Sequence, residues 1–146
     1  MKKIALMMLG FASLLVFSQV EVFACSCELP LGNITVKQQV GKARKNSRAV
    51  FMGEVLEVIR PEDSYSVIVK FRVDQIWKGK LRKELTLGTG TGGGDCGYRF
   101  EVGQRYLVYA YGSNETSLST NICQRTVPLK DAVGDIKLLG KGKMPS

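Results

Sequence analysis

Four cysteines are the residues of this sequence with the clearest capacity for chemistry. Cys25 and Cys27 are separated by one serine, whereas Cys96 and Cys123 stand alone much further along the chain. Cysteines as close as Cys25 and Cys27 do not easily bridge each other, so each is expected to pair with one of the two distant cysteines. The chain has no histidine, which excludes Ser-His-Asp and Cys-His nucleophile pairs and any histidine-based metal site. We therefore expect a protein that is not an enzyme and is held by two disulfides.

The N-terminal segment gives Cys25 a second kind of chemistry. Two lysines are followed by fourteen apolar or small residues from Ile4 to Phe17, and Ala24 precedes Cys25. This pattern is typical of a signal peptide over residues 1–24, and its apolar run is shorter than the roughly 20 residues of a membrane-spanning helix. Cleavage after Ala24 would give Cys25 a free α-amine, which together with its carbonyl can close a five-membered chelate ring on a metal ion. The alternative is a lipoprotein signal, in which Cys25 carries lipid.

The rest of the chain has the size of a single domain. Residues 25–146 number 122, enough for one hydrophobic core, and we expect the domain over 25–140 and a flexible Gly/Lys-rich tail over 141–146. Loss of Lys2, Lys3 and Glu21 with the leader leaves 19 basic and 12 acidic residues, a net charge of +7. This excess favours acidic partners or surfaces, or simply keeps an exported protein soluble.

The export signal and the cysteines together indicate an oxidising compartment. We expect a secreted or otherwise extracytoplasmic location, including the periplasm or the cell surface. We expect a monomer with no transmembrane segment and no nucleic-acid partner.

Hydrophobic periodicity predicts a mainly β fold with flanking helices. Residues 65–74 alternate apolar and polar side chains almost without a break, the period of a strand with one buried face. Capping residues before an i, i+4, i+7 apolar stripe predict a helix that starts near Val36. The expected strands cover 49–59, 65–76, 84–88, 105–111 and 117–123, and the expected helices cover 36–46 and 129–138. Five antiparallel strands fit a small closed barrel.

Three further patterns are given less weight. The glycine run over 88–93 matches a dinucleotide-binding fingerprint, but the sequence after it leads towards another strand and not into a helix; a flexible loop that lets Cys96 approach another cysteine is the preferred interpretation. A zinc site made by the four cysteines is the alternative to disulfides, although such sites usually contain closely spaced pairs. Asn33 and Asn114 begin glycosylation acceptor motifs.

Several motifs occur in an order that points to one family. They are Cys25-Ser26-Cys27, the strand sequence over 49–55, Asp95-Cys96-Gly97, the sequence over 103–109, and Cys123. Taken together, this order resembles the N-terminal domain of the tissue inhibitors of metalloproteinases, the netrin-like module.

The resemblance implies a fold, a disulfide pairing and a function. The fold is a five-stranded OB-type barrel with bridges Cys25–Cys96 and Cys27–Cys123. The function is a secreted inhibitor whose partner is a zinc metalloprotease. Cys25 chelates the catalytic zinc of the protease and Ser26 enters the specificity pocket. Cys27 is the second anchor, and Gly94, Asp95 and Cys96 form the flanking part of the inhibitory ridge. The zinc belongs to the target protease, so no cofactor of the chain itself is expected.

Departures from the family keep a second function open. Animal inhibitors have a third bridge in this domain and usually a second cysteine-rich domain, and both are missing here. The alternative is a non-inhibitory netrin-like module that binds a protein or an acidic polymer. Its binding surface would be the basic helix near Lys37 to Arg48, together with Lys78, Lys80, Arg82 and Lys83.

Overall fold

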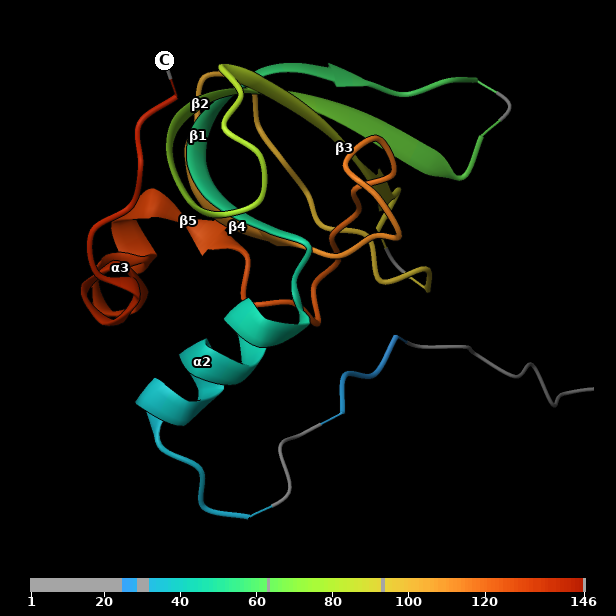
Figure 1. Cartoon of the computed structure of the whole chain (residues 1–146). Helices are drawn as coiled ribbons and strands as arrows, with labels where there is room; N and C mark the ends of the chain where they lie inside the picture. Colours follow the sequence, from blue (N-terminus) through green and yellow to red (C-terminus); the bar gives the residue numbers. More distant parts are fainter. Residues whose placement is uncertain (1–24, 29–31, 63, 93, 146) are drawn as a thin grey trace, which may run out of the picture.

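The computed structural model describes residues 25–28, 32–62, 64–92 and 94–145 (Figure 1). The predicted signal peptide, 1–24, lies outside the described residues. The elements in chain order are α2 (Val36–Asn46), β1 (Ala49–Ile59), β2 (Ser66–Lys78), β3 (Glu84–Gly90), β4 (Arg105–Ala110), β5 (Val127–Pro128), a 3-10 helix (Leu129–Asp131) and α3 (Val133–Leu139). Within the described part of the chain, no helix is long and apolar enough to cross a membrane.

The five strands form one antiparallel sheet in the order β3-β2-β1-β4-β5. β1 and β2 make a long, strongly curved hairpin (Figure 1). The register of this pair shifts next to Gly53, where an added Cβ would lie 2.5 Å from the carbonyl oxygen of Arg72. Glycine is therefore required at this irregularity, which bends the strand.

The part of the sheet made by β4 and the first half of β1 is buried on both faces, to which successive side chains point in turn. One face carries an aromatic and aliphatic core that includes Phe51, Phe71 and Phe100. The other face carries Val50, Leu107 and Tyr109 and is covered by α2 and α3. α2 begins at the predicted residue with a capping box, in which the Thr35 hydroxyl accepts from the Gln38 N–H and the Gln38 side chain accepts from the Thr35 N–H.

The prediction of a fifth strand over 117–123 is wrong, because the fifth strand of the sheet is the short β5, Val127–Pro128. Within 117–123, Ser119 forms isolated bridges to Gly88 of β3 and to Tyr111, just beyond β4. After that the chain turns, so that Cys123 reaches Cys27. The disulfide thus ends a segment whose residues alone favour a strand. The result is an open five-stranded sheet, in which one residue links β3 to the end of β4.

The C-terminal prediction also needs correction. The helix expected over 129–138 is divided into the 3-10 helix and α3. In the segment expected to be a flexible tail, Lys143 exchanges two backbone hydrogen bonds of 2.8 Å with Ile76 of β2. This pairing attaches the tail to the sheet.

Candidate functional site

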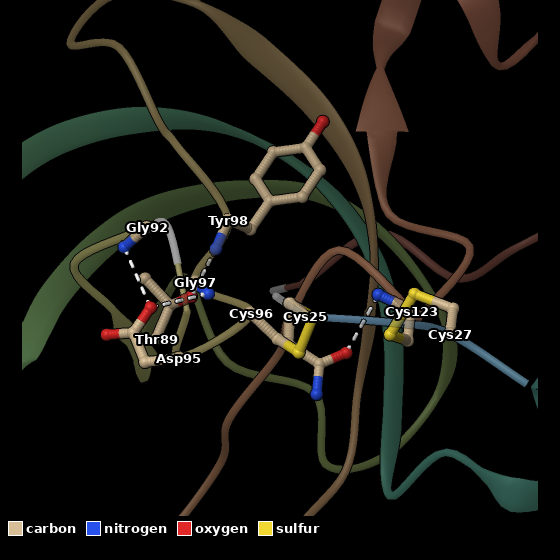
Figure 2. The surroundings of a disulfide bond; sticks show 10 residues. Cys25, Cys27, Thr89, Gly92, Asp95, Cys96, Gly97, Tyr98 and Cys123 are labelled. Atoms are coloured by element: carbon tan, nitrogen blue, oxygen red, sulfur yellow. Dashed lines mark hydrogen bonds between the residues drawn. A yellow bond between two sulfur atoms is a disulfide. The ribbon is translucent and has the colours of Figure 1, made fainter. Parts of the chain in front are cut away.

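Two neighbouring disulfides hold the described start of the chain against the domain (Figure 2). Cys25 is bonded to Cys96 and Cys27 to Cys123, the pairing that the resemblance implies, with Cα–Cα distances of 5.2 and 5.1 Å. The Sγ atoms of Cys25, Cys96 and Cys123 all lie within 4.8 Å of one another. Ser26 lies between the two anchored cysteines and is exposed.

Asp95 organises the loop that presents Cys96. Its carboxylate accepts hydrogen bonds from the backbone N–H groups of Gly97, Thr91 and Gly92, and from the Thr91 hydroxyl, at 2.7–3.0 Å. These bonds, the one from Gly97 first, lower the pKa of Asp95. The predicted ridge residue Asp95 therefore directs its carboxylate into its own loop.

The backbone around Cys96 explains why glycines surround it. Cys96 has φ 59°, in the left-handed region, and a Cβ on the buried Gly97 would overlap the carbonyl of Gly90. The loop thus packs against the end of β3. The described residues from 91 to 100 form turns and irregular chain, and not the helix that a dinucleotide site requires. Gly94 is exposed at the turn before Asp95.

The segment before Cys123 contributes residues that the sequence did not single out. The Asn121 side-chain oxygen accepts a hydrogen bond from the Cys123 N–H at 3.0 Å. The Ile122 N–H donates to the Cys96 carbonyl at 3.0 Å, and the Ile122 side chain is 49% exposed. An exposed apolar side chain thus lies beside the bridged cysteines. Its only sequence signal is its position next to Cys123.

Arg125 ties the segment after Cys123 to both helices. Its guanidinium makes two hydrogen bonds to the Asp135 carboxylate, at 2.7 and 2.8 Å, and a third to the Gln39 side chain at 3.0 Å. The Tyr109 hydroxyl donates to the same carboxylate at 3.0 Å. Burial raises the pKa of Tyr109, and the hydrogen bond to Asp135 raises the pKa of Arg125. This polar cluster fixes the direction in which the chain leaves the Cys27–Cys123 bridge.

A groove of about 1220 Å³ runs beside the described N-terminal residues. Its lining includes Ser26, Cys27 and Glu28, together with Lys42 of α2 and Arg125. Ser26 is therefore accessible to a second molecule from this groove.

No family model and no curated protein matches this chain. Any role of Cys25, Ser26 and the neighbouring loops must therefore be inferred from their chemistry and geometry.

The four cysteines are all closed in disulfides. A zinc site of four thiolates, the alternative to disulfides, would require both bridges to be reduced, because zinc binds the deprotonated thiol. Cleavage after Ala24, which the sequence predicts, would leave the α-amine and the carbonyl as the groups of Cys25 that can coordinate a metal. The bridges at Cys25 and Cys27, on either side of Ser26, restrict where these two groups can lie.

Proposed function

We propose that the exported protein inhibits zinc metalloproteases by coordinating the protease zinc through the α-amine and the carbonyl of Cys25. The observation that carries this proposal is the attachment of Cys25 and Cys27 to Cys96 and Cys123 on either side of an exposed Ser26. A chain terminus is normally mobile, and a bridge on each side of Ser26 removes that freedom before binding. Preorganisation of this kind lowers the entropic cost of association.

The chemistry matches the zinc of a metalloprotease. A catalytic zinc has three protein ligands and an open position occupied by water. The amine and carbonyl of one residue can displace that water and close a five-membered ring on the metal. Inhibition of this kind needs no turnover, and the lack of histidine in the chain is compatible with it.

The surrounding residues have distinct parts in this proposal. Ser26 extends into the specificity pocket of the protease, and Gly94 to Cys96 lie alongside, with the Asp95 carboxylate holding the loop in shape. Ile122 adds an apolar contact at the edge of the interface. We further propose that the sheet is a distorted OB-type barrel, supported by the two bridges that Ser119 makes to Gly88 and Tyr111.

One alanine inserted before Cys25 tests the mechanism. The insertion turns the amine into an amide, which is a poor zinc ligand, and adds atoms where the metal must lie. Inhibition of a zinc metalloprotease should be lost, while disulfide mapping and thermal unfolding remain those of the parent. The matched control carries the extra alanine after Ser146 and should inhibit normally.

Two outcomes contradict the proposal. One is equal inhibition by the extended and the parent proteins. The other is a parent protein, with its Cys25 start verified by mass spectrometry, that inhibits none of a panel of zinc metalloproteases with different specificity pockets. The second outcome would favour the non-inhibitory binding module.

The pH dependence gives a further check. A terminal α-amine ordinarily has a pKa of about 7.7–8.0 and coordinates zinc only when neutral. Inhibition should therefore weaken as the pH falls below this range. The protease's own pH profile, measured without inhibitor, is the control.

A further inference from the structure

Three segments of the chain carry an unusual concentration of positive charge. Residues 36–48, 76–83 and 140–145 contain eleven of the 21 lysines and arginines and no aspartate or glutamate. The eleven are Lys37, Lys42, Arg44, Lys45, Arg48, Lys78, Lys80, Arg82, Lys83, Lys141 and Lys143. The three segments are widely separated in the sequence, and Lys141 and Lys143 fall in the segment expected to be a flexible tail.

The fold joins these three segments around Trp77 and Lys78. The Arg44 guanidinium donates to the Trp77 carbonyl at 3.1 Å, and the Lys78 ammonium donates to the carbonyls of Arg44 and Lys45 at 2.9 and 2.8 Å. The Trp77 indole N–H donates to the Gly140 carbonyl at 2.8 Å. The end of β2 thus contacts both the last turn of α2 and the C-terminal segment.

We call the cations nearest these contacts the basic surface. It consists of Arg44, Lys45, Lys78, Lys80, Lys141 and Lys143. Their positions follow from the contacts above, from the pairing of Lys143 with Ile76, and from chain continuity.

Carboxylates do not neutralise the basic surface within the described part of the chain. Of the eleven cations, Arg48 alone has an ion-pair partner there, Glu115 at 3.4 Å. The other four described ion pairs belong to other basic residues: Lys70, Arg72, Arg105 and Arg125. An unbalanced cluster of this size produces a positive potential that attracts polyanions.

Two exposed apolar residues are sequence neighbours of these cations. Leu81, between Lys80 and Arg82, is 48% exposed, and Met144, next to Lys143, is 79% exposed. Single exposed apolar residues are ordinary, but these two lie on segments without any acidic residue. A soluble polyanion gains little from such side chains, whereas a bilayer takes them up at the boundary between headgroups and acyl chains.

We propose that the basic surface, with Leu81 and Met144, binds membranes that contain anionic phospholipids. Lysines and arginines near a negatively charged leaflet attract it through the surface potential, and the two apolar side chains then insert at the interface. This inference is independent of the proposed inhibition, because it uses neither the Cys25 amine nor the ridge.

The test measures binding of the exported, processed protein to vesicles of phosphatidylcholine with and without phosphatidylglycerol. Binding is expected only when the vesicles contain phosphatidylglycerol, and the affinity should decrease as the salt concentration rises. Joint substitution of Lys45→Gln, Lys80→Gln and Lys141→Gln should weaken it by about 100-fold, from the usual contribution of each cation near an anionic surface.

The matched control changes the net charge equally at Arg60→Gln, Arg99→Gln and Lys130→Gln, which lie outside the three segments and have no described ion pair. It should retain most of the binding. The emission spectrum of Trp77 verifies that both triple variants are folded. Equal loss in the two variants would mean that net charge and not this surface is responsible, and would overturn the proposal.

A second variant separates a bilayer from a soluble polyanion at constant charge. Leu81→Ser with Met144→Ser should weaken vesicle binding by about tenfold or more, because burial of these side chains is lost, and should leave binding to heparin unchanged. If this variant binds vesicles as the parent does, the membrane proposal is wrong. If, in addition, heparin binds the parent and not the lysine variant, the surface binds linear polyanions.

Discussion

Replacement of Asp135 by alanine would remove the centre of the polar cluster that supports the Cys27–Cys123 bridge. The Asp135 carboxylate accepts two hydrogen bonds from Arg125 and one from Tyr109. Its side chain is 10% exposed and that of Arg125 is 31% exposed. The alanine variant leaves the guanidinium with Gln39 as its one remaining described side-chain partner and leaves the Tyr109 hydroxyl unpaired.

The size of the effect follows from this burial. Removing one partner of a fully buried ion pair costs about 3–5 kcal/mol. Water reaches part of the Arg125 guanidinium, which reduces the loss, while an unpaired buried hydroxyl adds about 1 kcal/mol. We expect a decrease of about 3 kcal/mol in the free energy of unfolding. For a domain of this size that corresponds to roughly 10–15 °C in Tm.

Urea unfolding followed by tryptophan fluorescence measures this change directly. Trp77 is the sole tryptophan of the chain and belongs to the same core cluster as Tyr109. The control variant Asp135→Asn keeps an acceptor for the Tyr109 hydroxyl and should lose less than the alanine variant. A decrease below about 1 kcal/mol for Asp135→Ala would refute the reasoning, since it would place the cluster in the range of an exposed ion pair.

Three other predictions concern the bridges and the titrating groups. Joint replacement of Cys27 and Cys123 by serine opens a 96-residue separation and should cost about 2–5 kcal/mol in urea unfolding; an unchanged midpoint would contradict this. Because hydrogen bonds hold the folded-state pKa of Asp95 below its unfolded value, its carboxylate contributes stability above the unfolded pKa that disappears as pH falls through the folded pKa. The stability advantage of the parent over Asp95→Asn should shrink over that range, and a constant difference would argue against it. Burial raises the pKa of Tyr98 from 10.0 to about 12, so the folded state keeps this proton to a higher pH and the free energy of unfolding should fall as pH rises between these values. The difference in tyrosinate absorbance between the parent and Tyr98→Phe isolates the titration of Tyr98, and a midpoint near 10.0 would contradict this prediction.

Some features of the fold are local, and the sequence predicts them well. The alternation along 65–74 places Val67, Val69 and Phe71 in the core of β2, because a period of two is a property of the extended chain itself. Thr35 and Gln38 start α2 at the predicted residue, since a capping box needs only residues within one turn. The number of cysteines and the pattern of the N-terminal segment can likewise be read from the sequence without knowledge of the fold.

Other features depend on contacts between distant residues. The strand expected over 117–123 has suitable side chains, but the reach of Cys123 to Cys27 and the pairing of Ser119 with two different partners override them. The tail at Lys143 has no local preference for a strand and becomes ordered because it pairs with Ile76. In both cases contacts between residues far apart in the sequence decide the local structure.

The candidate site divides in the same way. Residue type and order are enough to show that Cys25 follows a segment with the pattern of a signal peptide, that Ser26 lies between two cysteines, and that no histidine is present for catalysis. Only the folded chain reveals that the Asp95 carboxylate turns into its own loop, that Ile122 lies beside Cys96, and that three basic segments meet at Trp77. The physical reason is that each of these hydrogen bonds has a backbone N–H or C=O group as one partner, and nearly every residue type carries the same backbone groups.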